Sequence, residues 1–301
     1  MSTTVERTRA PQTDRPPPAR PAARRRPFRD AHLDAGFYLI MLASILVMAV
    51  PLVWMFLASF KDNGEIYSMP LQWLPDAFAF FNYEQVSSSI PIERMFLNSV
   101  GLTIAGAGLK VFLGLCCAYA VVFIDVPFRK AVFVVVLFAL LIPGQITIIP
   151  NYSLIASLGW LNTYQGILVP GLASAFGTFL FRQHFLSLPI SVFEAAQVDG
   201  ASHWRRLWKF AVPMSVPTIA AVGLISLVNE WNDYLWPMLV TDNTDTMTLP
   251  VGLTLLQSLD GMQAWGVLMA ATVVVTVPML LIFLVLQRRL VAGLTAGAVT
   301  G

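Results

Sequence analysis

Apolar residues in this sequence gather in long runs that are separated by short polar segments. The runs contain no Asp, Glu, Lys or Arg apart from Lys110. They occupy residues 37–60, 95–124, 131–181, 210–229 and 261–287. About 20 apolar residues cross the hydrocarbon core of a membrane as a helix. Because the third run is long enough for two crossings with a turn between them, we predict six transmembrane helices.

The predicted spans cover about 37–59, 96–123, 131–149, a stretch from Gly166 into "GTFLFRQHF", 213–236 and 266–287. Pro143 and Gly144 lie in the third span and are expected to kink or unwind its outer half. The sequence therefore predicts an all-α fold class, that of a polytopic membrane protein.

Composition agrees with this class, because only 12% of residues are charged, about half the share usual in soluble domains. Residues 1–31 are rich in Pro and Arg and are expected to form a disordered cytoplasmic tail; contact with anionic lipid is the alternative. Residues 32–301 form the predicted six-helix domain, which includes a cytoplasmic loop at 188–209. The first apolar run is too long for the core of a secretory signal peptide.

The basic residues predict the orientation of the chain. With both ends on one side, that side holds 16 of the 19 Lys and Arg residues, whereas the other side holds only Lys61 and Arg94. Loops rich in Lys and Arg stay cytoplasmic. We therefore predict a multi-pass protein of the plasma or inner membrane with cytoplasmic N- and C-termini.

The segment "SLPISVFEAAQVDGASHWRRLWKFAVP" interrupts the apolar runs with charge and strong helix formers. Ser191 and Glu194 have the spacing of a capping box, and "VFEAAQV" suits a helix of about two turns. Gly200 permits a bend, after which "SHWRRLWKF" is predicted to form a second helix that continues into the fifth span. The alternative is an amphipathic helix on lipid headgroups, anchored by Trp204 and Trp208.

Small side chains in the first of these helices would let the backbone of a partner protein approach closely. The segment resembles the cytoplasmic EAA signature of ABC importer permeases. The residues in register with that signature are Glu194, Ala195, Ala196, Gly200 and Pro213. Phe210 and Val212 replace the Ile and Leu of the family pattern.

The resemblance implies a type I ABC importer permease fold, in which this helix docks on an ATP-hydrolysing subunit and Glu194 pairs with a basic residue there. The expected contact residues are Glu194, Ala195, Ala196, Asp199, Gly200 and Ala201. The implied partners are a second, related permease, an ATPase dimer and an extracytoplasmic solute-binding protein. The chain itself needs no cofactor, since the ATPase would bind ATP and Mg²⁺, and no nucleic-acid partner is expected.

Two further segments narrow the resemblance. "NEWNDYLWP" and "QRRLVAGLTAGAVTG" are similar to the carbohydrate-type branch, the relatives of maltose permeases. "GTFLFRQHFLSLP" and "VNEWNDYLWPMLV" resemble the permeases of importers for sn-glycerol-3-phosphate or glycerophosphodiesters. The alternative substrate is a neutral oligosaccharide of the maltose or trehalose type.

The chain is not expected to be an enzyme. Gly101 and Gly106 are spaced as in a P-loop, but Ala107 stands where the lysine is required. No metal-binding motif occurs in any span. A secondary carrier is the alternative from another class, but it would need carboxylates or histidines near the membrane midplane. His32, His184 and His203 all lie in predicted cytoplasmic segments.

Lys110 is the one basic residue well inside a span. A charge there costs about 2.5–3.5 kcal/mol on insertion scales, so the side chain should face a cavity or a partner. Lys110 could attract an anionic substrate such as a phosphate ester. The structural alternatives are an ion pair with Glu230 or Asp233, or a side chain that reaches the membrane surface.

Further candidates for the substrate pathway are polar residues in or near the outer halves of the spans. The "NEWNDYLWP" segment combines amide and carboxylate groups with aromatic rings, as polyol sites do. It could equally form an aromatic belt with hydrogen bonds between helices. The candidates are Asn229, Glu230, Asn232, Asp233 and Tyr234, with Gln145 and Asn151 beside the Pro143–Pro150 break.

Overall fold

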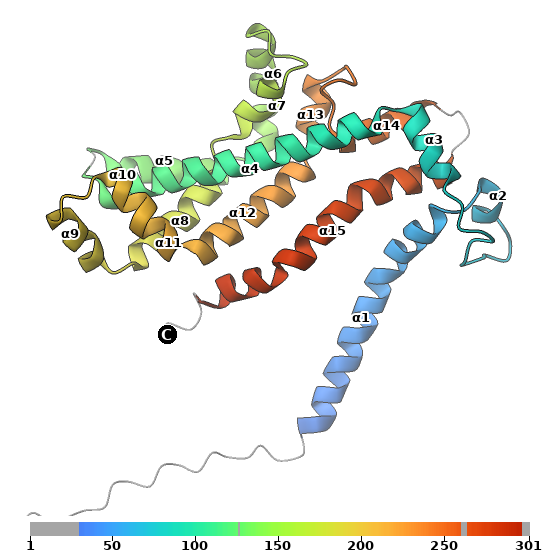
Figure 1. Ribbon diagram of the computed structural model, residues 1–301, viewed down its shortest axis with the longest axis horizontal. Helices are drawn as coiled ribbons and strands as arrows, with labels where there is room; N and C mark the ends of the chain where they lie inside the picture. The colour runs from blue at the N-terminus through green and yellow to red at the C-terminus, as the bar shows by residue number, and fades with distance from the viewer. Residues whose placement is uncertain (1–29, 126, 260–263, 297–301) are drawn as a thin grey trace, which may run out of the picture. The chain divides into compact units, whose positions relative to one another are not determined.

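The computed structural model describes residues 30–125, 127–259 and 264–296 (Figure 1). Every regular element within these ranges is a helix, which confirms the predicted all-α class. Residues 1–29 and 297–301 lie outside the described residues, and so does the prediction of a disordered tail.

The α-helices and the three shorter 3₁₀ or π turns follow one another along the chain. They are α1 (Asp30–Ala58), α2 (Asn63–Ile66), α3 (Phe81–Ser89), α4 (Ile92–Phe123), α5 (Arg129–Leu141), η1 (Gly144–Thr147), α6 (Ile148–Ser157), α7 (Tyr164–Leu168), η2 (Val169–Gly171), α8 (Ala175–Ser187), α9 (Ile190–Val198), α10 (His203–Arg206), η3 (Leu207–Ala211), α11 (Val212–Met214), α12 (Val216–Trp231), α13 (Leu235–Val240), α14 (Leu249–Leu259) and α15 (Trp265–Ala296).

The chain divides into two units, Met1–Pro51 and Leu52–Gly301. The described part of the first unit is α1 from Asp30 to Pro51. Most of α1 is apolar, with a mean hydropathy of 2.5 over Gly36–Ala58, and it coincides with the first predicted span. All remaining helices belong to the second unit.

Three helices of the described residues are long and apolar enough to cross a membrane unaided. They are Gly36–Ala58, Ile92–Phe123 and Trp265–Leu284. Three further crossings are possible if each of three bent helix pairs is one span. The described residues therefore supply between three and six spans, and the count of six stays a prediction.

The first bent pair confirms the kink expected at Pro143 and Gly144. Arg129–Leu141 and Gly144–Ser157 meet at 96°, so the chain turns sharply there instead of continuing straight. Proline at such a break removes a backbone donor. The second pair, Tyr164–Gly171 with Ala175–Ser187, bends by 45°.

The third bent pair lies where the helix after Gly200 was predicted to continue into the fifth span. His203–Met214 and Val216–Trp231 meet at 85° at Ser215. Pro213 and Pro217 flank this residue, and neither can donate a backbone hydrogen bond. The Ser215 hydroxyl donates to the Ala211 carbonyl at 2.7 Å. This bond satisfies a carbonyl at the break, so the sharp bend leaves that group paired.

α4 is the helix around which the second unit packs. Three apolar clusters meet on it: Met95 belongs to the cluster with α12, α14 and α15, and Leu102 to the cluster with α6, α7 and α13. Leu115 belongs to the third cluster, with α8, α9 and α12. α4 also carries Lys110, so the packing fixes the position of that charge.

Small residues allow α4 and α8 to cross closely. A Cβ on Gly114 would lie 3.3 Å from the backbone nitrogen of Thr178 and 3.4 Å from the carbonyl carbon of Gly177. Close backbone contact through glycine is a major source of helix association in membranes, where lipid removes the hydrophobic driving force.

The segment between α13 and α14 is tied to the start of α4. The Asn98 side chain donates to the carbonyls of Asp245 and Met247, both at 2.9 Å. The backbone N–H of Leu249, the first residue of α14, donates to the Ser99 hydroxyl at 2.7 Å. These bonds fix the start of α14, which hydropathy did not predict.

Candidate functional site

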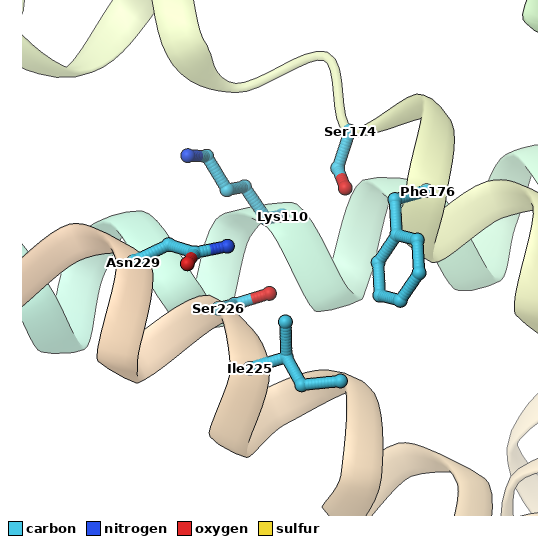
Figure 2. A pocket seen from close by; sticks show the side chains of 6 residues that line it. All are labelled: Lys110, Ser174, Phe176, Ile225, Ser226 and Asn229. Carbon is cyan, nitrogen blue, oxygen red and sulfur yellow. The ribbon is translucent and has the colours of Figure 1, made fainter. Parts of the chain in front are cut away.

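A cavity of about 270 Å³ lies between α4, α8 and α12 (Figure 2). Lys110 comes from α4, whereas Ser174 and Phe176 lie at the start of α8. The α12 residues that complete the lining are Ile225, Ser226 and Asn229. The cavity therefore combines one cation, one amide and two hydroxyls with an aromatic ring and an aliphatic wall.

Lys110 forms an ion pair with Glu230 of α12, and its ammonium group donates to the Glu230 carboxylate. The side chains are only 19% and 15% exposed. Charges withdrawn from water to this degree are tolerated when they are paired. One of the two structural alternatives predicted for Lys110 is therefore present, and the lysine of the pair lines the cavity.

Gly106 provides the space that the carboxylate occupies. It lies one turn before Lys110 on the same face of α4, and a Cβ at this position would overlap the Glu230 Oε2 atom. In the sequence, Gly106 was discussed only as part of a possible P-loop. In the structure, its missing side chain leaves room for the Glu230 carboxylate.

The structure brings together three of the predicted pathway residues, Lys110, Asn229 and Glu230. Asn232 and Tyr234 are exposed, and Asn232 donates to the Val228 carbonyl at 2.8 Å. Asp233 follows in the same break between α12 and α13, and none of these three lines the cavity.

Gln145 and Asn151 also lie away from the cavity. Gln145 is an exposed residue of η1, and Asn151 is a partly exposed residue of α6. The 96° bend separates this segment from α5 and directs it elsewhere. Both residues remain predictions for the pathway, without a contact to Lys110.

The two tryptophans of "NEWNDYLWP" hold helices together. Trp231 is 3% exposed, and its indole N–H donates to the Val275 carbonyl of α15 at 3.0 Å. Trp236 donates to the carbonyls of Gly166 and Ile167 at 3.2 and 3.1 Å. These two rings therefore form hydrogen bonds between helices, as in the alternative to a polyol site.

Sequence reasoning missed Ser174, Phe176, Ile225 and Ser226. Ser174 had a local signal, because it precedes an apolar helix as an N-cap residue does; its hydroxyl accepts from the Gly177 N–H at 3.1 Å. Ser226 could have been found from its spacing, because it lies four residues before Glu230 and therefore on the same face of the helix.

The segment that resembles the EAA signature forms α9 and α10, two short helices as predicted, with one correction at its start. α9 begins at Ile190 after Pro189, which occupies the N-cap position without a side-chain cap. Ser191 lies inside the helix, so the predicted capping box with Glu194 is wrong. The short link between α8 and α9 places proline, with its fixed φ, at the boundary that Ser191 was expected to occupy.

Gly200 ends α9 in a Schellman motif. Its φ is +73°, a conformation that glycine adopts without strain. The Gly200 N–H donates to the Gln197 carbonyl at 3.0 Å, and the Ala201 N–H donates to the Ala196 carbonyl at 2.9 Å. Ser202 then caps α10 through the Arg205 N–H. The predicted bend at Gly200 is confirmed.

α9 is fastened to the rest of the unit through its inner face. Phe193 is 3% exposed and stacks on Phe123, the last residue of α4, with ring centroids 4.2 Å apart. The buried Arg206 of α10 donates to the Gln197 side chain at 3.0 Å. Ala196 is also buried, which corrects the expectation that it faces a partner.

The opposite face of α9 is open. Glu194, Ala195 and Asp199 are exposed, and Val198 is 88% exposed. Ala201 is partly exposed beyond the turn. This surface has one carboxylate on the helix, a second at its end and small or aliphatic side chains between them.

Comparison with protein families shows to which family the chain belongs. The model of the family described as "Binding-protein-dependent transport system inner membrane component" matches residues 110–296, which is more than half of the chain. The chain belongs to this family of membrane permease components. The matched region contains Lys110, Glu230 and the whole of α9.

Relatives match most of the chain. The "sn-glycerol-3-phosphate transport system permease protein UgpE" of Pectobacterium atrosepticum is 33% identical over 269 residues, which is 87% of this chain and 96% of that protein. Proteins of the same name from Yersinia pestis and Brucella abortus are each 32% identical. Those matches cover 87% and 85% of this chain, and 96% and 94% of the relatives.

Solved structures share the fold at lower identity. A chain of a bacterial ABC transporter for import of the acidic polysaccharide alginate matches with a TM-score of 0.78 and 22% identity, covering 89% of this chain and 99% of that chain. A structure of bacterial alginate ABC transporter with a periplasmic protein that holds an alginate pentasaccharide gives a TM-score of 0.59 and 18% identity. That match covers 86% of this chain and 94% of the other. The predicted importer permease fold is thereby confirmed.

Proposed function

We propose that this chain is the permease subunit of an ATP-driven importer for sn-glycerol-3-phosphate or glycerophosphodiesters. Relatives of that name are 32–33% identical over 85–87% of the chain. The observation that carries the substrate class is the lysine at the cavity, because a phosphate ester needs a cation on its path. Family membership in a binding-protein-dependent system argues against a secondary carrier.

The partners follow from this function. A solute-binding protein would deliver the substrate on the outer side, and a second permease would complete the pore. An ATPase dimer would bind ATP and Mg²⁺ and hydrolyse the nucleotide. The distribution of Lys and Arg supports an orientation with both termini in the cytoplasm, which places α9 on the side of the ATPase.

The exposed face of α9 is the docking surface for the ATPase in this proposal. A short helix binds a protein groove through side chains on one face. Glu194 and Asp199 would pair with basic residues of the ATPase, while Ala195 and Ala201 would allow close approach. Ala196 would act from inside by packing α9 on its own unit.

Contacts within the unit give α9 a route to the cavity. Phe193 stacks on Phe123 at the end of α4, the helix of Lys110. Arg206 joins α9 to α10, which continues through the 85° bend into α12, the helix of Glu230. A displacement of α9 would therefore act on both partners of the ion pair.

In this mechanism, the Glu230 carboxylate occupies the position on Lys110 that the phosphate of the substrate would take. In the described state the Lys110 ammonium is bound by the Glu230 carboxylate. A phosphate ester entering the cavity would offer oxygens to the same ammonium, while Asn229 and Ser226 could hydrogen-bond glycerol hydroxyls. Movement of α4 against α12 would separate the pair and open the site to the substrate.

A neutral oligosaccharide is a second candidate, and the ion pair itself favours it. A lysine already neutralised by Glu230 leaves the cavity without excess charge. Phe176 and the nearby hydroxyl and amide groups then suit a sugar ring. In that case the pair would only join α4 to α12.

Removal of both charges tests whether Lys110 binds the phosphate of the substrate. Lys110→Met with Glu230→Met leaves no unpaired charge in the membrane, so the complex should assemble. If Lys110 binds the phosphate, uptake of radiolabelled sn-glycerol-3-phosphate should fall at least about tenfold, the effect of one charged hydrogen bond. Unchanged uptake would reject this role for Lys110.

The chain offers a matched control for this experiment. Arg94 and Asp245 also form an ion pair that involves α4, at 2.9 Å, but their side chains are 57% and 63% exposed. Arg94→Gln with Asp245→Asn removes the same charges from a solvated site, where a pair contributes about 0–1 kcal/mol. This variant should transport at the parent rate.

A further inference from the structure

A second cavity of about 270 Å³ lies where the ends of α4 and α8 meet the start of α5. Three of its lining residues are basic: Arg129 and Lys130 from α5, and Arg182 from α8. It lies on the side of the membrane that the basic residues assign to the cytoplasm, away from the Lys110 cavity.

Positive charge in this cavity is incompletely matched. Asp125 lies 3.6 Å from Arg129, but the aspartate side chain is 98% exposed. Such a solvated pair contributes little. Asp125 is also absent from the cavity lining. The lining thus carries three cations and no carboxylate.

Arg182 has an unfulfilled donor at this position. Its guanidinium carbon lies 3.7 Å from the centre of the Phe133 ring, which holds the planar group by a cation–π contact. The Nε atom is buried and has no hydrogen-bond partner among the described residues. A buried donor without a partner costs about 1–3 kcal/mol, so an acceptor is expected there.

The start of α5 adds a second source of positive potential. Phe128 precedes the helix with a φ of +63°, and no side chain caps the first turn. The free N–H groups of a helix N-terminus favour an anion. The first two residues of this helix, Arg129 and Lys130, line the cavity.

The remaining residues that line the cavity are apolar, and they favour an anion that carries apolar groups. Val121, Val122 and Leu186 line the cavity beside Phe133. Phe128, next to Arg129, is 82% exposed. A soluble phosphate would gain nothing from these side chains, whereas the glycerol and acyl carbons of a phospholipid would cover them.

We infer that this cavity, defined by Arg129, Lys130, Phe133 and Arg182, binds the phosphate headgroup of an anionic phospholipid from the inner leaflet. Basic pockets between spans on the cytoplasmic side commonly bind such headgroups. The phosphate oxygens accept hydrogen bonds from the Arg182 guanidinium and the Lys130 ammonium. The site is independent of the proposed substrate.

Native mass spectrometry of the full-length chain, purified with its co-purifying subunits and stripped of lipid, tests the inference. We expect phosphatidylglycerol to be retained at least about tenfold better than phosphatidylcholine, the value of one charged hydrogen bond. Arg182→Gln should remove this preference. Lys130→Gln, at an exposed residue, should weaken it without affecting folding, so the test stands if the Arg182 variant misfolds.

Arg94→Gln is the matched control, because it removes one basic charge from an exposed outer site and should leave retention unchanged. Equal retention of the two lipids would overturn the inference, as would full retention in the Lys130 variant. Displacement of phosphatidylglycerol by an equal concentration of inorganic phosphate would show a site for soluble anions and would also overturn it.

Discussion

At the scale of single residues, the Lys110–Glu230 pair is the feature that bears most directly on the proposed function. It is largely withdrawn from solvent, and breaking a buried pair by removing one partner costs about 3–5 kcal/mol. A single substitution at either position therefore mixes loss of function with loss of stability. For this reason, the double substitution is the informative variant.

Gly106 gives a prediction at the same scale. Gly106→Ala would place a Cβ on the Glu230 carboxylate and displace it from Lys110. We expect the free energy of unfolding to fall by roughly 1–3 kcal/mol, as for other overpacked positions. Thermal unfolding of the purified complex measures this change.

Gly108→Ala is the control for Gly106→Ala. It lies half a turn away on α4, and a Cβ there meets nothing within 4 Å. Because alanine is the better helix former by about 1 kcal/mol, this variant should be no less stable than the parent. Equal melting temperatures for the two variants would contradict the role assigned to Gly106.

Residues that act through their own chemistry were predictable from the sequence. Lys110 was identified because charge is rare inside an apolar run, and Gly200 because glycine permits a turn. Trp231 could not be assigned, since an indole at a helix end suits both a membrane interface and a core. Only the Val275 carbonyl, 44 positions further on, decides its role.

At the scale of elements, the two faces of α9 differ in what they contact. Phe193 and Ala196 fix the helix to its unit, while Glu194, Ala195 and Val198 remain open. A helix of nine residues is too short to be stable alone. Its conformation therefore depends on the inner contacts and on the Schellman turn at Gly200.

Substitution of Gly200 tests this dependence. Gly200→Val should strain the turn by about 1–2 kcal/mol, because a β-branched residue is disfavoured at φ +73°. We expect the ATPase subunit to co-purify less with this variant. Gly200→Asn is the matched control, since asparagine tolerates this conformation. Equal recovery of the ATPase from both variants would show that the turn does not position α9.

The elements that hydropathy predicted well are the long apolar helices that can cross a membrane. α1, α4 and α15 follow from long apolar runs, in which Lys110 is the one charge. The kink at Pro143 and Gly144 was also predicted, whereas the 85° bend at Ser215 and the short α13 and α14 were not. The segment that leads into α14 is held by distant contacts, such as the bonds from Asn98 to residues 245 and 247, which no local pattern reveals.

At the scale of the whole molecule, orientation in the membrane is the prediction to test. Met69 of the outer loop and Val198 of α9 are 94% and 88% exposed. In a variant without Cys116 and Cys117, we expect Met69→Cys to react with a membrane-impermeant maleimide in intact cells. Val198→Cys should react only after permeabilisation and removal of peripheral subunits. Labelling of Val198→Cys in intact cells would show that α9 faces the outside, which would contradict the predicted orientation.

The central claim is that this permease couples ATP hydrolysis to uptake of a phosphate ester. The most direct measurement is the ATPase rate of the complex purified from its native membrane with its solute-binding protein, with sn-glycerol-3-phosphate, a glycerophosphodiester or a disaccharide added. We expect the phosphate compounds to stimulate the rate and the sugar not to. Stimulation by the disaccharide alone would contradict the substrate assignment, and absence of a co-purifying ATPase would contradict the coupling role of α9.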